Sequence, residues 1–321
     1  MSTHRDDTPS AALFNELHEL LRQEDNKKRG FRAWQIVLEA SANSDFAVVF
    51  DFALEKGLIL PVDQGGKSAD GQPHGSTVWT NPVDGSQMGW IPPGPFYVGK
   101  EKEHRAECRG FSLARHPVTN AQFKRFLDVT GYTPPENHPN PALFLSHSTS
   151  PLLALRAQEV AQHPVVWVSY VDALHYCRWA GLTLPTEWMW EKAARGPDGR
   201  DYPWGAWPEG KQKLANVESD GTCPVGSFPR TRTAYGCEDM IGNVSEWCQI
   251  TKDGDYGYMP PALPDLDLWQ EGTYAAVRGS CFLRSNPSRM TCWHRRRLSI
   301  TRRNQWVGFR PALPLPCRPA L

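Results

Sequence analysis

The stretch Asp239-Met-Ile-Gly-Asn-Val-Ser-Glu-Trp247 lies within a long region, beginning near Trp90, of short apolar runs and tryptophan-rich loops. Glycine and proline interrupt these runs throughout, and the chain contains 26 glycines and 28 prolines. Such punctuation is typical of short strands joined by irregular segments and leaves room for only a few helices. We therefore expect a mixed α+β domain over residues 89–321, with most of its chain in loops.

Three helices in this region have recognisable start and stop signals. Val118-Thr-Asn120 supplies an N-cap for a helix over 121–129, and Gly131 ends it. Ser169 and Asp172 have the spacing of a capping box for a second helix. The remaining signals are Gly181 at the end of that helix, Thr186 as the cap of Glu187–Arg195, and Gly196 after it.

The N-terminal part has a different pattern. Apolar residues recur at helical spacing over 9–57, which predicts a small acidic helical module within residues 1–61. Residues 62–88 are rich in Gly, Ser, Asp, Pro and Gln with little periodicity, and are predicted to be a linker or an irregular wrap. The domain boundary is accordingly expected at residue 89.

The formal net charge is zero, from 35 basic and 35 acidic side chains. This balance excludes a strongly basic nucleic-acid binder or an acidic disordered tail. The charge is nevertheless uneven, because residues 278–321 contain ten arginines and no carboxylate. These arginines either form a basic surface or are buried against acids from upstream.

Composition narrows the class of protein further. The chain is 40% hydrophobic and has 13 tryptophans, which is enough to bury a core. The most apolar run, Phe46–Leu54, is short and contains Asp51, so no membrane span is expected. The N-terminus lacks the apolar core of a secretory signal, and we expect a cytoplasmic protein. Its eight scattered cysteines include no Cys-x-x-Cys pair and are expected to be mostly free thiols.

Many ordered motifs in residues 89–313 resemble the formylglycine-generating enzyme, or sulfatase-modifying factor, superfamily. Besides 239–247, they are Ile91-Pro-Pro-Gly-Pro-Phe-Tyr-Val-Gly99, His116-Pro-Val-Thr-Asn-Ala-Gln-Phe123, His163-Pro-Val-Val-Trp-Val-Ser169, Leu184-Pro-Thr-Glu187, Trp190-Glu-Lys-Ala-Ala-Arg195, Tyr202-Pro-Trp-Gly205, Val277-Arg-Gly-Ser280 and Gly308-Phe-Arg310. The resemblance implies a C-type-lectin-like fold with two helices beside a small, twisted antiparallel sheet and long loops. It does not settle function, because the superfamily includes oxidases, sulfoxide synthases and binding proteins.

The catalytic residues of the enzymes resembling this chain are not found at the matching positions. Those enzymes hold copper on two cysteines five positions apart, between the Gly-Gly-Ser and Gly-Phe-Arg motifs, and soft Cu(I) favours such thiolates. Three possible alignments place Leu283 and Ser288, Arg284 and Arg289, or Phe282 and Pro287 there. The iron-dependent branch uses three histidines, and the N-terminal region has only His4, His18 and His74 with no paired spacing. We therefore expect no catalytic cofactor and a protein that is not an enzyme.

A structural calcium ion is the one metal that the resemblance implies. Its ligands would be Asp239, the carbonyls of Gly242 and Val244, and the Glu246 carboxylate, a set of the kind that Ca²⁺ takes. A weaker second set would use Asn216, the Val217 carbonyl and Asp220. The competing interpretation of Glu246 is a buried carboxylate paired with an arginine of the C-terminal block.

In proteins of this superfamily, the segment from Arg278 to Arg310 forms the central ligand-facing surface. The resemblance implies that Arg278, either Arg295 or Arg296, and Arg310 are structural clamps on buried acids. The residues left for binding are of types that dominate binding hot spots. They are Arg284, Arg289, Trp293, His294, Arg297, Arg302, Arg303 and Trp306.

These residues support a first hypothesis of function, that the chain is catalytically inactive and binds a protein partner with an acidic surface. The resemblance suggests an accessory or regulatory role in a bacterial defence system, either CRISPR-associated or linked to a retroelement. A metal-dependent oxidoreductase acting on a peptide or thiol is the first alternative. The second is nucleic-acid binding by the basic face, which we do not expect because the acidic N-terminal module lacks a basic stripe.

Overall fold

The computed structural model describes most of the C-terminal three quarters of the chain. The described residues are 78–100, 102, 104–108, 110–133, 160–207, 214–249, 273–284 and 286–314, with 15–17, 19, 20, 22, 36 and 61–62 further upstream. Most of the predicted N-terminal helical module and Arg318 lie outside the described residues. Among the described residues, no helix is both long and apolar enough to cross a bilayer.

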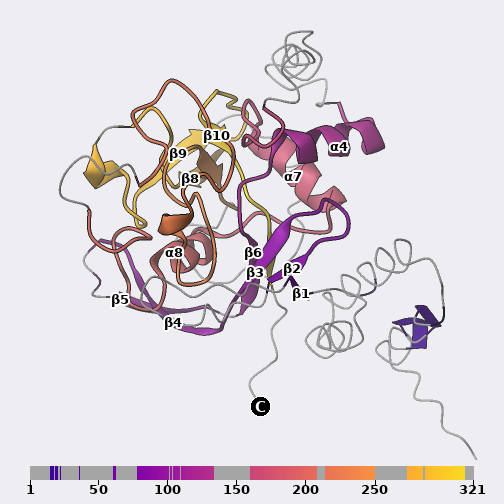
Figure 1. Cartoon of the computed structure of the whole chain (residues 1–321), viewed down its shortest axis with the longest axis horizontal. Helices are drawn as coiled ribbons and strands as arrows, with labels where there is room; N and C mark the ends of the chain where they lie inside the picture. Colours follow the sequence, from indigo (N-terminus) through magenta and orange to yellow (C-terminus); the bar gives the residue numbers. More distant parts are fainter. Residues whose placement is uncertain are drawn as a thin grey trace, which may run out of the picture.

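Three small sheets form the β part of the domain (Figure 1). The five-stranded sheet has the order β1 (Pro61–Val62), β2 (Val78–Thr80), β3 (Gln87–Ile91), β6 (Phe111–Ala114) and β11 (Ala312–Pro314). The four-stranded sheet has the order β10 (Val307–Gly308), β7 (Ser245–Trp247), β8 (Tyr274–Arg278) and β9 (Arg295–Ser299). Strands β4 (Gly94–Val98) and β5 (His104–Cys108) form a separate ribbon.

Pairing within the sheets is antiparallel except between β10 and β7, which run parallel. The α+β class with small sheets and few helices is therefore confirmed. The predicted boundary at residue 89 falls inside β3, and β2 pairs with β3 from Val78 onward. Residues 78–80 and 87–88, which the sequence assigns to a linker or irregular wrap, thus lie in strands of the five-stranded sheet.

All three predicted helices of this region form with the predicted caps. They are α4 (Asn120–Thr130), α7 (Tyr170–Trp179) and α8 (Glu187–Arg195). The N-caps Thr119, Ser169 and Thr186 each accept a backbone N–H from the first turn. Gly131 ends α4 in the left-handed conformation at φ 62°, where glycine is favoured because it has no Cβ.

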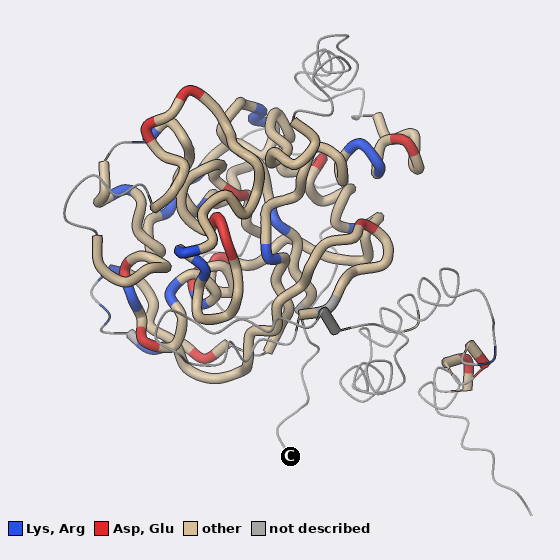
Figure 2. Tube along the Cα trace, viewed as in Figure 1, with Lys and Arg blue, Asp and Glu red and all other residues tan. Residues whose placement is uncertain are grey.

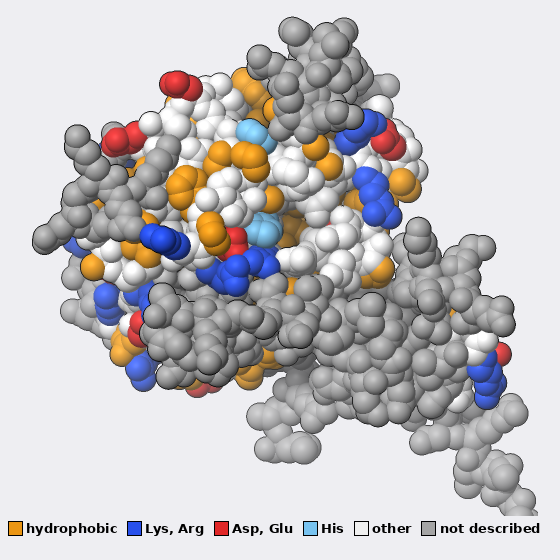
Figure 3. Space-filling view, viewed as in Figure 1, with side chains coloured by type: hydrophobic (Ala, Val, Ile, Leu, Met, Phe, Trp, Pro, Cys, Tyr) orange, Lys and Arg blue, Asp and Glu red, His pale blue; other side chains and the backbone are white. Residues whose placement is uncertain are grey.

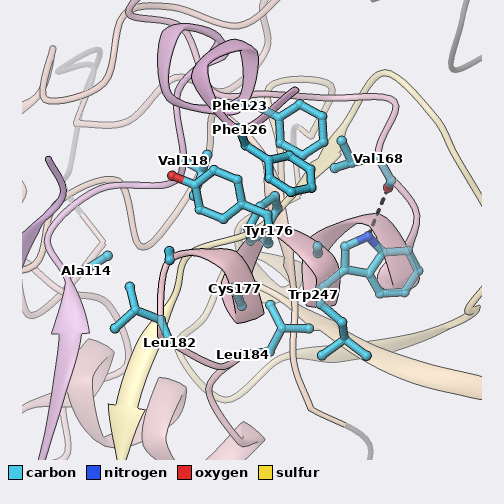
Figure 4. Close-up of a cluster of buried hydrophobic side chains, with 14 of the residues drawn as sticks. Ala114, Val118, Phe123, Phe126, Val168, Tyr176, Cys177, Leu182, Leu184 and Trp247 are labelled. Atoms are coloured by element: carbon cyan, nitrogen blue, oxygen red, sulfur yellow. Dashed lines mark hydrogen bonds between the residues drawn. The ribbon is translucent and has the colours of Figure 1, made fainter. Parts of the chain in front are cut away.

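Helices α4 and α7 pack together through aromatic rings (Figure 4). Phe123 of α4 stacks on Tyr176 of α7, with ring centroids 5.8 Å apart, and Phe126 meets the same tyrosine edge to face. Trp247 of β7 lies near the start of α7, where its ring meets Tyr170 edge to face and its Nε1–H donates to the Val168 carbonyl at 3.1 Å. This core therefore fixes β7, which carries Glu246, against the two helices.

Helix α8 lies against β4, β5 and β8 and is unusual because its charged side chains are buried. The Lys192 ammonium donates to the carbonyls of Pro92 (2.6 Å) and Gly94 (3.0 Å), which anchors the β4–β5 ribbon. Buried charge costs free energy unless it is paired and hydrogen-bonded. Figure 2 shows basic and acidic positions next to one another through the middle of the domain, consistent with such pairing.

Candidate functional site

Two arginines of the segment 278–310 are buried clamps, as predicted. Arg278 donates to the Glu191 carboxylate at 2.6 Å and lies 3.5 Å from that of Glu187, both on α8. Arg310 donates to both oxygens of Glu246, at 2.7 and 2.8 Å, with no exposed side chain on either partner. Charge-assisted hydrogen bonds of this kind are strong, so these contacts join β8 to α8 and the segment between β10 and β11 to β7.

Arg295 and Arg303 are also clamps. Arg295 lies 3.2 Å from Glu187, which selects it over Arg296 as the third predicted clamp. The sequence predicts that Arg303 lies on the binding surface, but its side chain is fully buried and donates to the Asp172 carboxylate at 2.6 Å. Tyr132 donates to the other oxygen of Asp172 at 3.0 Å. Arg303 is therefore removed from the candidate binding residues.

The other candidate residues keep some exposure. Arg289, Arg297 and Arg302 are exposed, and Arg284, Trp293, His294 and Trp306 are half-buried. Within the described part of the chain, no carboxylate comes within ion-pair distance of Arg284, Arg289 or Arg302. Figure 3 shows one face of the domain, on which basic side chains occur in small groups among uncharged and hydrophobic ones.

One arginine that was not predicted to bind joins this group. The Arg296 guanidinium lies over the Trp306 ring, 4.8 Å from its centroid, and has no ion-pair partner among the described residues. Burial, followed by the charges of Arg284 and Arg289, lowers the pKa of Arg296. Burial and the charges of Arg278, Arg289, Arg296 and Arg284 lower the pKa of His294. The charges of Arg284, Arg289 and Arg296 thus act on His294, and we call these four residues the arginine cluster.

The predicted calcium ligands do not fit a cation site as they are placed. Both Glu246 oxygens accept from Arg310, and one also accepts from the Trp190 indole at 2.7 Å. One Asp239 oxygen accepts from the Gly226 N–H at 2.7 Å. The Arg310 guanidinium occupies the position that calcium would need on Glu246. Glu246 is therefore a buried carboxylate paired with an arginine of the C-terminal block, which is the competing interpretation given above.

The second predicted calcium set is likewise engaged in hydrogen bonds. The Asn216 amide donates to the Gly221 carbonyl at 2.9 Å, and its oxygen accepts from Ser219 at 2.6 Å. Val217 is half-buried and Asp220 is exposed. We expect that removal of calcium with a chelator leaves the melting temperature of the purified protein unchanged. A fall on chelation that calcium, but not magnesium, reverses would contradict this.

None of the positions aligned with the copper ligands is a cysteine, and the cysteines nearby in sequence are not exposed. Leu283 is 50% exposed, Phe282 is buried, and Arg284 and Arg289 belong to the arginine cluster. Cys281 and Cys292 are buried, and burial raises the pKa of both thiols, which opposes thiolate formation. The seven described cysteines form no disulfide. Among the described residues, no three His, Cys, Asp or Glu side chains are grouped to hold a metal ion.

Glu238 is the centre of a charged group that the sequence analysis did not identify. Its buried carboxylate accepts from Arg115 Nε at 3.0 Å and Arg232 Nε at 2.8 Å, and lies 3.4 Å from His116 Nε2. Burial alone would raise the pKa of Glu238, but hydrogen bonds from His116 and Arg115 outweigh it and lower the pKa to about 2. Arg115 and His116 are adjacent in sequence, but nothing in the sequence indicates that both face Glu238.

This depressed pKa predicts a defined loss of stability in acid. Glu238 contributes stability that is complete above its ordinary pKa of 4.5 and is lost as pH falls towards about 2. The loss over this window should be about 2–3 kcal/mol, measured by denaturant unfolding. The Glu238→Gln variant should be less stable at neutral pH and lack this component. An unchanged acid profile in that variant would contradict the assignment.

Comparison with known proteins agrees with this architecture. The sulfatase-modifying factor enzyme 1-like domain matches residues 76–314. The serine/threonine-protein kinase Pkn1 of Chlamydia trachomatis is 37% identical over 214 residues, covering 65% of this chain and 34% of that protein. The formylglycine-generating enzyme of Mycobacterium tuberculosis is 35% identical over 203 residues, covering 47% of this chain and 67% of that enzyme.

A solved structure shows the same fold. PvdO from Pseudomonas aeruginosa superposes with a TM-score of 0.56 at 26% identity, covering 74% of this chain and 98% of that one. The chain spans only about a third of the length of the chlamydial kinase, so the activity in that protein's name does not transfer with the match. The domain match covers well over half of the chain. The chain therefore belongs to the sulfatase-modifying factor enzyme 1-like family.

Proposed function

We propose that this protein is a catalytically inactive member of its family that binds an acidic protein partner through its arginine-rich C-terminal face. The observation that carries the proposal is a division among the arginines of residues 278–310. Arg278, Arg295, Arg303 and Arg310 pair with acids. Arg284, Arg289, Arg296 and Arg302 have no carboxylate partner among the described residues.

Two half-buried tryptophans occur in the same segment as the unpaired arginines, which supports binding of a protein. Trp293 and Trp306 are half-buried, and Arg296 lies over the Trp306 ring. Arginine and tryptophan are the residues most enriched at the centres of protein interfaces, where each offers a large contact area. An acidic partner surface would neutralise these charges and make association fast and sensitive to salt. The accessory role in bacterial defence stays a prediction, which the neighbouring genes would test.

Charge reversal on the exposed arginines tests this proposal. In the Arg289→Glu/Arg302→Glu variant, retention of a native partner is expected to fall at least about tenfold, because favourable charge pairs become repulsive. The control is Arg230→Glu, which reverses an exposed arginine elsewhere on the domain. Quantitative affinity purification of the three proteins, with bound proteins identified by mass spectrometry, makes the measurement. Equal recovery with all three would contradict the proposal.

Absence of oxidase activity is the second expectation. No alignment puts cysteine at the copper positions, so the protein supplied with copper and a cysteine-containing peptide should consume no oxygen and form no aldehyde. Oxygen electrode traces and peptide mass spectra check this. Turnover would instead support the oxidoreductase alternative. If the protein bound single-stranded DNA as tightly as its protein partner, and this binding weakened steeply with salt, the nucleic-acid alternative would be favoured.

A further inference from the structure

A short turn in the segment 278–310 presents an exposed apolar side chain. The Arg284 N–H donates to the Cys281 carbonyl at 3.1 Å, which closes a turn with Leu283 next to its end. Leu283 is 50% exposed, whereas Cys281 and Phe282 before it are buried and hold the turn on the domain. A single exposed leucine is common on protein surfaces, so the charges around it decide what it can do.

A loop with two exposed carboxylates lies against this turn. The Glu218 N–H donates to the Arg284 carbonyl at 3.1 Å, and the Ser219 N–H donates to the Phe282 carbonyl at 3.0 Å. Glu218 is exposed, and so is Asp220. The two backbone hydrogen bonds therefore bring two acidic residues next to the turn that carries Leu283 and Arg284.

Buried hydrogen bonds fix the conformation of this loop. Asn216, which is 4% exposed, donates from Nδ2 to the Gly221 carbonyl at 2.9 Å. Its Oδ1 accepts from the Ser219 hydroxyl at 2.6 Å. The loop is thus closed on itself from Asn216 to Gly221 and joined to the turn before any partner arrives, which lowers the entropic cost of binding.

The acidic and basic groups of this region do not neutralise one another. Glu218 and Arg284 are joined through their backbones, yet within the described part of the chain neither they nor Asp220 form an ion pair. Protein interfaces place opposite charges against each other, which orients the partner and excludes wrong partners. We call Glu218, Asp220, Leu283 and Arg284 the mixed-charge patch.

We propose that the mixed-charge patch docks a segment of the protein partner in which an apolar side chain has one basic and one acidic neighbour. This inference rests on the proposed function and adds a basic residue to the acidic surface of the partner. The acidic neighbour would pair with Arg284, and the basic neighbour with Glu218 or Asp220. The two carboxylates would repel a uniformly acidic segment, as they would the phosphates of a nucleic acid.

The test uses the full chain and two degenerate peptide libraries with a central leucine. The mixed library has lysine on one side of the leucine and aspartate on the other, in both orders, and the acidic library has aspartate on both sides. The mixed library should bind about fivefold more tightly, as expected for exposed ion pairs gained and repulsion avoided. Fluorescence anisotropy of the labelled peptides measures the two affinities.

Three variants separate the charges from the apolar contact. Glu218 has φ 51°, a conformation that asparagine tolerates, so Glu218→Asn should keep the melting temperature while reducing the preference for the mixed library to about twofold or less. Glu107→Asn, the same change at an exposed glutamate of β5, should keep the preference. Leu283→Ala should weaken binding of both libraries alike, by about threefold, because it removes apolar contact area.

Each other result contradicts a stated part of the inference. Equal affinity for the two libraries, or a preference that survives Glu218→Asn, would overturn the mixed-charge patch and leave the acidic-partner function standing. Tightest binding of a third library, with lysine on both sides of the leucine, would overturn both. Binding of none of the libraries would overturn the patch as a docking site, while the charge-reversal test of the acidic-partner function would still stand.

Discussion

Replacing Arg310 with methionine should lower the free energy of unfolding by about 3–5 kcal/mol, because the Glu246 carboxylate would then be a buried charge without its partner. Arg310 also donates to the carbonyls of Ala114 (3.0 Å), Arg115 (2.9 Å) and Glu238 (2.9 Å). One guanidinium therefore connects the five-stranded sheet, the four-stranded sheet and the loop before β7. Denaturant unfolding followed by tryptophan fluorescence makes the measurement.

The control is a double variant that removes the charges of both Arg310 and Glu246. The Arg310→Met/Glu246→Gln variant has no unpaired ion, so it should recover part of the loss, as buried pairs replaced together often do. A single variant that loses less than about 1 kcal/mol would contradict the assignment of Arg310 as a buried clamp. A double variant no more stable than the single one would show that the lost carbonyl contacts, and not the charge, dominate.

The second large effect is a difference between two neighbouring positions: replacing Arg303 should lower the free energy of unfolding strongly, whereas replacing Arg302 should hardly change it. Arg303→Met removes the partner of fully buried Asp172 and should cost about 3–5 kcal/mol. Arg302→Met changes an exposed side chain and should stay within about 0.5 kcal/mol. Thermal unfolding of the two variants in parallel checks both values. Similar losses at both positions would contradict the assignment of one arginine to the core and one to the surface.

Local signals made the helices predictable. Thr119, Ser169 and Thr186 cap their helices as predicted, because a cap depends on residues within one turn of the chain. Strand β2 has only three residues, too few for an alternating pattern, so the domain boundary was placed inside β3. The short strands depend on pairing with distant segments, which sequence periodicity does not contain.

The candidate site was predictable only in part, because its pairings also join residues that are far apart in the sequence. Arg278 and Arg310 were identified as clamps by their motifs, but Arg303 was not, because its partner Asp172 is 131 residues away. Asp172 itself was recognised only as part of a capping box. Arg296 was missed because its exposure and its contact with Trp306 follow from the pairing of β9 with β8. Composition identifies an arginine-rich segment, and tertiary pairing divides its arginines into clamps that pair with acids and others, such as Arg289 and Arg302, that have no carboxylate partner among the described residues.

The most direct test of this division is an arginine-to-glutamine scan across residues 278–310, with the free energy of unfolding measured for each purified variant. Arg278, Arg303 and Arg310 should each lose about 3 kcal/mol or more, since each leaves a buried carboxylate unpaired. Arg284, Arg289 and Arg302 should stay within about 0.5 kcal/mol of the parent protein or gain stability as repulsion is relieved. Losses at these three positions as large as those at the clamps would contradict the account.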